Sequence, residues 1–392
     1  REVLLKKNKN NNKRKIFISH FVGLSGIGGV QRNFLEYINN QVISESKFVH
    51  KVYTLGEVDP QYKLLVEVYN IRKLTNLLLL ILDMISRRKI VHFYNNLSSL
   101  KMAVLLFLLP VSNIILHERG TVWNIPSSRG ILLRFVAWKA RLILANSNAT
   151  KIMLEKKFHI LNKKIRVLHN GINTSIECTK RKVEHEDPPF FRIGFIGRLD
   201  APKGVHVLID AMHYLTDSRI KLVIAGDGTL IDILKTQAYD LENVSFIGRV
   251  SDPYNFLSGL DLLVVPSIRE PLGNVCLEAG LCSIPVLATN VDGIPEIIKN
   301  KVSGELITPT QVVSFETTNN SVSIPEFTVN PLTEELSPPK QINSEILSAK
   351  ILELSTSHAL LRKYGKNLHK IVMNYFNINR YTNELHDIYF KM

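Results

Sequence analysis

The chain has 392 residues, of which 45% are hydrophobic and 21% charged, and its formal net charge is +14. This composition excludes a chain that is disordered throughout, and the length exceeds what one core usually serves, so we expect two packed domains. The longest apolar runs, at 77–82 and 102–111, are well short of the roughly 20 residues needed to cross a bilayer, and no transmembrane helix is predicted.

The first half of the chain reads as a parallel sheet covered by helices. Residues 1–14 are rich in Lys and Asn without an apolar signal core, and we expect a flexible tail. From Lys15 onward, short β-branched runs alternate with helical stretches, which predicts a first α/β domain over 15–185. Its expected strands are 16–20, 48–54, 90–94, 113–117, 142–145 and 165–169.

The second half repeats this organisation. Charges cluster and periodicity fails over 173–189, as is typical of a linker, and a second α/β domain is predicted over 186–375. Residues 311–341 are rich in Thr, Ser, Asn and Pro, so we expect an exposed insertion or a mobile loop. Helical patterns follow to the end, and 376–392 is expected to pack back on the first domain. The predicted strands are 191–196, 220–225, 244–247, 262–265 and 286–288.

The positive charge is concentrated in the first half. Residues 1–187 hold 31 Lys and Arg against 13 Asp and Glu, whereas residues 188–392 hold 18 against 22. No nucleic-acid motif is present, so an anionic membrane surface or an anionic acceptor is the favoured partner, and a solvated basic face is the alternative. Cations lie beside apolar residues at 72–73, 87–89 and 151–158.

The cysteines bear on the compartment. Cys178, Cys276 and Cys282 are odd in number and have no spacing typical of a metal site, so we expect neither a metal nor a disulfide framework. This indicates a reduced compartment. We therefore expect a cytoplasmic protein, and the basic first half adds the expectation that it is peripheral on the inner face of the cytoplasmic membrane.

Two glutamates follow the apolar run at 262–265. Glu270 and Glu278 have seven residues between them, at the point where a parallel sheet presents hydroxyl-binding groups at its carboxyl edge. An ionised carboxylate accepts two hydrogen bonds from a diol, so two carboxylates suit the hexose and the ribose of a sugar nucleotide. The alternatives are a helix cap for Glu270 and a solvated helix-face carboxylate for Glu278.

A diphosphate site is predicted at the start of the second domain. Arg198 and Lys203 lie five residues apart at a glycine-flanked turn, which offers a bidentate guanidinium, a mobile ammonium and close backbone approach. Arg198 could instead pair with Asp200 on the surface. The sequence has no Asp-x-Asp and no His/Cys cluster with metal-ligand spacing, so no metal is expected.

Taken in order, these motifs resemble the retaining glycosyltransferases of family four, the glycosyl transferases group 1 type. The resemblance implies a GT-B fold, in which two Rossmann-like, doubly wound α/β domains face each other across a central cleft. It is specific over 190–308 and rests in the first half on 28–32, His117 and 170–171. The motifs that carry it are Ile196-Gly197-Arg198 with Lys203-Gly204, Ala225-Gly226-Asp227-Gly228, Phe246-Ile247-Gly248, the segment 270–278, and the segment 290–296.

The resemblance implies a role for each matching position. Glu270 would bind the donor sugar hydroxyls and His117 would line the sugar site, while Glu278 would hold the ribose. His117 could alternatively be a core histidine. The donor diphosphate would be held by Arg198 and Lys203, by the backbone of Leu272, Gly273 and Asn274 at a helix start, and by the close approach of Gly28 and Gly29.

Two further regions are less closely assigned. The nucleotide base would lie near Arg249 and Val250. Glu118 and Arg119 are candidates for contact with the acceptor, or they pair with each other.

The function implied is a retaining, metal-independent hexosyltransferase without a cofactor. It would move a hexose from a UDP-sugar or GDP-sugar to a glycan or lipid-linked saccharide in envelope polysaccharide biosynthesis, that is, of lipopolysaccharide, capsule or exopolysaccharide. The alternatives are a nucleotide-sugar epimerase of GT-B type and a glycosyltransferase-like subunit that binds without turnover. A dehydrogenase fits poorly because residues 23–29 lack the G-x-G-x-x-G spacing.

Overall fold

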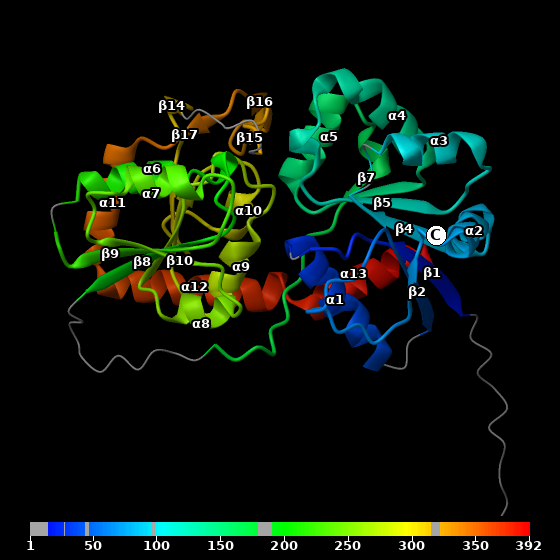
Figure 1. The fold of residues 1–392 in the computed structure, drawn as a ribbon, viewed down its shortest axis with the longest axis horizontal. Helices are drawn as coiled ribbons and strands as arrows, with labels where there is room; N and C mark the ends of the chain where they lie inside the picture. Colours follow the sequence, from blue (N-terminus) through cyan, green and yellow to red (C-terminus); the bar gives the residue numbers. More distant parts are fainter. Residues whose placement is uncertain are drawn as a thin grey trace, which may run out of the picture.

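The protein consists of two α/β domains that lie side by side (Figure 1). The computed structural model describes residues 15–26, 28–43, 47–95, 97, 99–178, 190–215, 217–314 and 322–392. The predicted tail at 1–14 and most of the predicted linker therefore lie outside the described residues.

The first domain is built on a seven-stranded parallel sheet with the order β3-β2-β1-β4-β5-β6-β7. The six strands predicted for this domain are confirmed, with ends shifted by one or two residues. The seventh, β3, has three half-buried residues at the sheet edge, too few to give an alternating pattern. The strands are β1 (Ile16–Phe21), β2 (Phe48–Thr54), β3 (Val68–Asn70), β4 (Lys89–Tyr94), β5 (Ile114–Glu118), β6 (Leu142–Ala145) and β7 (Ile165–Val167).

Helices cover both faces of this sheet. On one face α1 (Gly29–Ile43) shares a core with α13 (Ile378–Phe390), the last helix of the chain. On the other face, a single core unites α2, α3, α4 and α5. Local signals start some of these helices: the Ser147 hydroxyl accepts a hydrogen bond from the Thr150 amide at 2.9 Å and caps α5. The helices of the second face are α2 (Leu74–Ile85), α3 (Leu100–Leu108), α4 (Gly130–Lys139) and α5 (Asn148–Phe158).

The second domain has a six-stranded parallel sheet with the order β10-β9-β8-β11-β12-β13. Its five predicted strands are confirmed, and the short β13 was not predicted. The strands are β8 (Phe191–Ile196), β9 (Ile220–Ala225), β10 (Val244–Gly248), β11 (Leu262–Val265), β12 (Val286–Thr289) and β13 (Glu305–Ile307).

The helices of the second domain form two layers. One face of the sheet packs against α6 (Val205–His213), α7 (Ile231–Gln237) and α11 (Ser344–Ser355). The other face packs against α8 (Pro253–Ser258), α9 (Asn274–Leu281) and α10 (Ile294–Ile297). The long α12 (His358–Tyr375) runs beneath this domain toward the first one and contributes to both cores (Figure 1).

The chain passes between the domains at two places, and these two crossings are hydrogen-bonded to each other. The amide of Ile172 donates to the carbonyl of Phe376 at 2.7 Å, and the amide of Ile378 donates to the carbonyl of Ile172 at 2.9 Å. Arg380 in α13 donates to the carbonyls of His169 and Asn170 at 2.8 and 2.9 Å. Segments far apart in sequence therefore form one joint between the domains.

The segment expected to be an exposed insertion or loop differs from that expectation over 322–341. It contains the hairpin of β15 (Thr328–Asn330) and β16 (Glu335–Ser337), while β14 (Gln311–Val312) pairs with β17 (Lys340–Gln341). Val329 is buried against the core of the first domain, and Glu326 lies 3.1 Å from the Lys157 ammonium. The hairpin is thus a bridge from the second domain to α5.

The same contacts correct the reading of 151–158 as a membrane-binding segment. Ile152, Met153 and Leu154 in α5 are buried, and the ammonium of Lys156 pairs with Glu335 while that of Lys157 pairs with Glu326. Lys156 and Lys157 therefore face residues 326–335 of the second domain, whereas Lys151 pairs with Glu155 on α5 itself.

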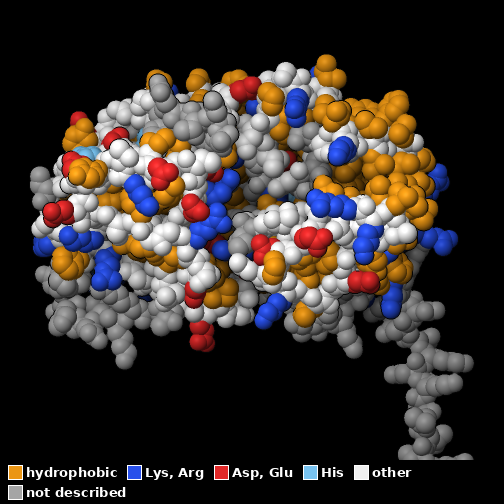
Figure 2. Space-filling model, viewed as in Figure 1, with side chains coloured by type: hydrophobic (Ala, Val, Ile, Leu, Met, Phe, Trp, Pro, Cys, Tyr) orange, Lys and Arg blue, Asp and Glu red, His pale blue; other side chains and the backbone are white. Residues whose placement is uncertain are grey.

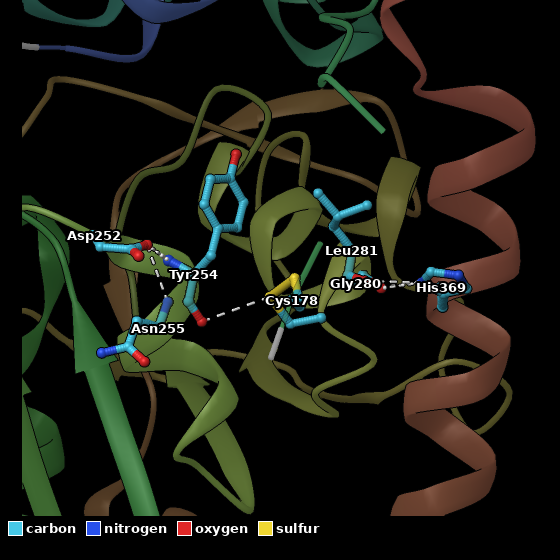
Figure 3. The surroundings of a disulfide bond; sticks show 8 residues. Cys178, Asp252, Tyr254, Asn255, Gly280, Leu281 and His369 are labelled. Carbon is cyan, nitrogen blue, oxygen red and sulfur yellow. Dashed lines mark hydrogen bonds between the residues drawn. A yellow bond between two sulfur atoms is a disulfide. The ribbon is translucent and has the colours of Figure 1, made fainter. Parts of the chain in front are cut away.

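Two cysteines are paired, which contradicts the expectation of no disulfide. Cys178, at the start of the linker, is bonded to Cys282 at the end of α9, with a Cα–Cα distance of 5.2 Å (Figure 3). Next to this bond, the His369 ring on α12 lies 3.1 and 2.9 Å from the carbonyls of Gly280 and Leu281. The inference of a reduced compartment assumed unpaired cysteines, and it loses that support.

The outer surface over α2, α3 and α4 is rich in exposed apolar side chains (Figure 2). Within the described part of the chain, no helix combines the length and the apolarity required to cross a bilayer.

Candidate active site

Two loops at the carboxyl edge of the second sheet are held together by a close backbone contact. Strand β8 leads into a 3₁₀ turn, η4 (Ala201–Lys203), and the adjacent β11 leads into the loop that carries Glu270. Gly204 has φ +66°, and a Cβ there would lie only 2.0 Å from the carbonyl oxygen of Pro266. A glycine is therefore needed at 204 for the two loops to pack.

Lys203 and Glu270 meet as a result of this packing. The Lys203 ammonium lies 2.5 Å from Oε2 of Glu270, and the hydroxyl of Ser267 donates to the same oxygen at 3.4 Å. Glu270 is largely buried, with 8% of its surface exposed. The alternative role of Glu270 as a helix cap is not the observed one, because no side chain caps α9 and Gly273 stands at the N-cap position.

Arg198 lies on the same edge with an exposed guanidinium. Its side chain is 66% exposed and forms an ion pair with Asp200 at 3.1 Å. The pairing considered as an alternative is thus present. The Arg198 guanidinium is also open to solvent and could reach a ligand. Its role in phosphate binding stays a prediction.

The first domain approaches this edge through the start of α1. A Cβ placed on Gly29 would lie 2.3 Å from Nδ2 of Asn274, the first residue of α9. The Asn170 amide from the first domain donates to Oδ1 of Asn274 at 2.7 Å. The N-termini of two helices, one from each domain, therefore meet at one point, and both partial positive charges act there.

The second carboxylate lies across the domain boundary from a cation. Oε1 of Glu278 is 3.7 Å from the Arg32 guanidinium on α1. Burial raises the pKa of Glu278 to about 7, and Arg32 partly opposes this. Glu278 is thus not the solvated helix-face carboxylate of the alternative reading. Glu36 lies nearby, and burial, with a smaller contribution from Glu278, raises its pKa to about 7.

His117 is a buried ring at the end of β5. It stacks on His92 with a centroid distance of 5.3 Å, and burial, aided by Arg119, holds its pKa well below the usual value. Among the described residues, neither ring nitrogen of His117 has a hydrogen-bond partner. An unpartnered buried polar group is costly in free energy, so the His117 ring would gain from a hydrogen-bond partner supplied by a ligand.

Glu118 and Arg119 are engaged with other parts of the first domain. The Glu118 carboxylate accepts hydrogen bonds from the amides of Gly120 and Val122 at 2.9 and 3.2 Å, and so shapes its own loop. The Arg119 guanidinium donates to Asn33, to Asn170 and to the carbonyl of Val30. Glu118 and Arg119 therefore bind other groups and not each other, and their contact with the acceptor stays a prediction.

Four predicted positions remain, at Gly28, Leu272, Arg249 and Val250. Leu272 is buried before the start of α9, and Gly28 accepts a hydrogen bond from the Arg32 amide at 3.0 Å. Arg249 follows β10 and pairs with Asp227 at 3.2 Å, next to the half-buried Val250.

Two residues important to the geometry were not singled out from the sequence. Asp292 accepts hydrogen bonds from the amides of Glu270 and Val329 at 2.9 and 2.7 Å and from the Trp123 indole at 3.3 Å. Burial raises the pKa of Asp292 to about 7. Arg269 is buried and donates to the carbonyl of Gly120 at 3.1 Å. The only signal in the sequence was the place of Asp292 inside the motif 290–296 and of Arg269 directly before the motif 270–278.

This edge of the second domain therefore combines opposite charges in a small volume. Lys203, Arg198 and two helix N-termini supply positive charge, and Glu270 and Glu278 supply carboxylates for hydroxyls. Such an arrangement suits an anion attached to a polyhydroxylated group. Among the described residues, no group of three or more His, Cys, Asp or Glu is arranged to hold a metal ion.

Comparison with known proteins finds a family match within the second domain. Residues 177–323 match the family model described as glycosyl transferases group 1. An uncharacterised glycosyltransferase of Methanocaldococcus jannaschii is 34% identical over 168 residues, which are 39% of this chain and 43% of that protein. The capsular polysaccharide biosynthesis glycosyltransferase CapM of Staphylococcus aureus is 32% identical over 123 residues, or 30% of this chain and 32% of CapM. The match thus spans less than half the length of either curated relative.

Solved structures share the whole fold. Anabaena HepE in complex with UDP-glucose superposes with a TM-score of 0.74 at 18% identity, covering 96% of this chain and all of HepE. This likeness extends over both domains, beyond the segment that the family model matches. The expected GT-B fold of two Rossmann-like domains is confirmed, and residues 177–323, which form most of the second domain, match the glycosyl transferases group 1 family.

Proposed function

We propose that the protein is a retaining hexosyltransferase that takes a hexose from a UDP-sugar or GDP-sugar and transfers it to a saccharide acceptor. The observation that carries the proposal is the meeting of Lys203, Glu270 and the start of α9 with Gly29 of the opposite domain. A sugar nucleotide offers an anionic diphosphate flanked by two sets of hydroxyls. The cations and the carboxylates of this site match both kinds of group.

The diphosphate would lie between the two helix N-termini, beside Lys203 and Arg198. The absence of a side chain at Gly29 allows the backbone of the first domain to approach the phosphates closely. On donor binding, the Lys203 ammonium would exchange its contact with Glu270 for a phosphate oxygen, and Arg198 would turn from Asp200. Fixed positive charge would then stabilise the leaving diphosphate.

The transferred hexose would be held by Glu270, with His117 on the side of the first domain. Released from Lys203, the Glu270 carboxylate would accept hydrogen bonds from sugar hydroxyls. The unpartnered ring of His117 would gain a hydrogen bond that it lacks without a ligand. Glu278 would bind the ribose. The ribose hydroxyls would donate hydrogen bonds to the Glu278 carboxylate and so favour the ionised form of this side chain.

The proposed mechanism relies on positioning and electrostatics. The acceptor hydroxyl would attack the anomeric carbon from the face that the diphosphate leaves, and a phosphate oxygen would take the hydroxyl proton. The anomeric configuration is then retained. Analysis of the product by NMR tests this step, and an inverted anomer would refute it.

For the acceptor, we propose a glycan or a lipid-linked saccharide of envelope polysaccharide biosynthesis. CapM, which matches 30% of this chain, is named for capsular polysaccharide biosynthesis, and this supports the choice of acceptor. The acceptor would bind over the first domain.

The first test is the binding of the donor. A thermal-shift panel of UDP, GDP and their hexose conjugates should raise the melting temperature for one nucleotide series, because a ligand that binds only the folded state stabilises it. Failure of every nucleotide would refute the proposal. Turnover then separates the alternatives: release of nucleoside diphosphate that depends on an acceptor supports transfer. Isomerisation of the donor without acceptor indicates an epimerase, and binding without either reaction indicates a non-catalytic subunit.

A further inference from the structure

The outer surface of the first domain carries an unusual amount of exposed apolar area. Most of the exposed side chains on α2 and α3 are three or four residues apart, and the two on α4 are seven apart, so they lie along one side of each helix. We call this surface the α2–α4 face, and its apolar members are Leu74, Leu78 and Leu82 on α2, Leu100, Val104, Phe107 and Leu108 on α3, and Ile131 and Trp138 on α4.

These side chains form one surface and not three separate stripes. The opposite sides of the three helices share one buried core, to which Leu80, Leu106 and Leu133 belong, so their outer sides face the same way. The ring of Phe135 links α3 and α4, with centroid distances of 6.1 Å to Phe107 and 6.2 Å to Trp138. Figure 2 shows the apolar atoms as a broad area on the first domain, with cationic side chains beside it.

The charges on this face are all of one sign. Between residues 71 and 141, Asp83 and Glu118 are the only acidic residues, and both are buried. Lys139 on α4 lies 5.5 Å from the ring centroid of Trp138. The exposed cations of the same stretch are Arg72, Lys73, Arg87, Arg88, Lys101, Arg129, Arg134 and Arg141.

We propose that the α2–α4 face binds the surface of an anionic lipid bilayer, with its apolar side chains at the level of the acyl chains and its cations at the headgroups. An apolar area bordered by cations is the chemistry that such an interface selects. A second copy of this chain is a poorer occupant because cations would then face cations across the contact. The inference is independent of the proposed reaction, since no residue of the donor site belongs to this face.

The two tryptophans of the chain allow a direct test. Trp123 is 1% exposed in the core, whereas Trp138 is 66% exposed on the α2–α4 face. Vesicles of phosphatidylcholine containing phosphatidylglycerol should shift the tryptophan emission to shorter wavelength and sediment the protein at low salt. Pure phosphatidylcholine should do so much less. In Trp138→Phe the emission shift should vanish while sedimentation persists.

Variants locate the binding surface. We expect Phe107→Ser with Leu108→Ser, and separately Lys101→Glu with Arg134→Glu, each to weaken vesicle binding at least about tenfold. The matched control is Tyr239→Ser with Leu332→Ser, which changes two exposed apolar residues of the second domain and should bind as the unaltered chain does. Circular dichroism should show each variant to be folded, because all of these side chains are exposed.

Three results would overturn the proposal. The first is no binding to anionic vesicles at low salt. The second is unchanged binding by the Phe107→Ser, Leu108→Ser variant, which would locate the contact elsewhere. The third is a Trp138 emission shift that needs no vesicles and grows with protein concentration, with dimers in sedimentation velocity, which would assign the face to a second copy.

Discussion

The ammonium of Lys203 lies 2.5 Å from the carboxylate of Glu270, which places a candidate phosphate ligand and a candidate sugar ligand in one ion pair. Each side chain satisfies the other while no donor is bound, and both are only partly exposed. Donor binding would replace this pair by two ligand contacts. The two residues are therefore expected to differ in which step of the reaction they affect.

Substitution of each member should separate binding from turnover. Lys203→Gln removes a charged contact to the diphosphate and should weaken UDP or GDP binding by about 1.5–3 kcal/mol, roughly ten- to hundredfold. Glu270→Gln should leave the affinity for the free nucleoside diphosphate within about threefold but lower turnover at least about tenfold. Isothermal titration calorimetry and a nucleotide-release assay measure the two effects. Equal loss of nucleotide affinity in both variants would contradict the division of roles.

The meeting of these two residues was accessible from the sequence, whereas the contacts that hold them were not. Lys203 and Glu270 follow strands β8 and β11, which are neighbours in a doubly wound sheet, so their loops share one edge. Asp292 and Trp123 are different: their hydrogen bond joins residues 169 positions apart in separate domains. Such a contact depends on how the domains pack, which local periodicity does not encode.

The close approach at Gly29 predicts a strong effect of one methyl group. In Gly29→Ala the new Cβ would push Asn274 away and loosen its hydrogen bond to Asn170. We expect donor turnover to fall at least about tenfold because a displacement of about 1 Å at a reacting site is costly. Gly23→Ala is the matched control from the same loop, where a Cβ meets nothing within 4 Å. Equal activity of both variants would show that this approach is not needed.

Two half-buried histidines, His50 and His386, should make the first domain sensitive to acid. Burial lowers the pKa of His50 and His386 to about 4, so the fold favours their neutral forms. Their stabilising contribution is complete above the unfolded pKa of about 6.5 and is lost as the pH falls toward 4. The free energy of unfolding in urea should therefore decline over this window. His386→Phe should make that decline shallower, and an unchanged slope would contradict the assignment.

The sequence failed at the disulfide and the hairpin for related reasons. Cys178 and Cys282 are 104 residues apart, and their pairing depends on how residues 176–178 pack against the core that contains α9. The strands of the hairpin are three residues long, too short for an alternating pattern, and the polar composition resembled that of a loop.

The disulfide gives a chemical prediction. Loop closure by a disulfide typically stabilises a protein by about 2–4 kcal/mol, so Cys178→Ser should lower the free energy of unfolding by about that amount. Adding reductant should lower it equally in the unaltered chain but have little effect on the variant. Alkylation of the denatured, unreduced protein should label Cys276 alone, the free cysteine among the described residues. Labelling of all three cysteines would show that the bond does not form.

Glu36 should destabilise the protein at alkaline pH. Its folded pKa of about 7 lies above the ordinary 4.5, so its contribution is most favourable below pH 4.5 and is lost as the pH rises through 7. Glu36→Gln cannot ionise and should exceed the unaltered chain in unfolding free energy at pH 8 by about 1–3 kcal/mol. At pH 5 the two should be nearly equal, and Glu57→Gln, at an exposed site of the same domain, is the control. The sign is opposite to that of the histidines, so urea unfolding across pH 4–8 separates the two groups. A gain at pH 8 no larger than at pH 5 would contradict burial as the cause.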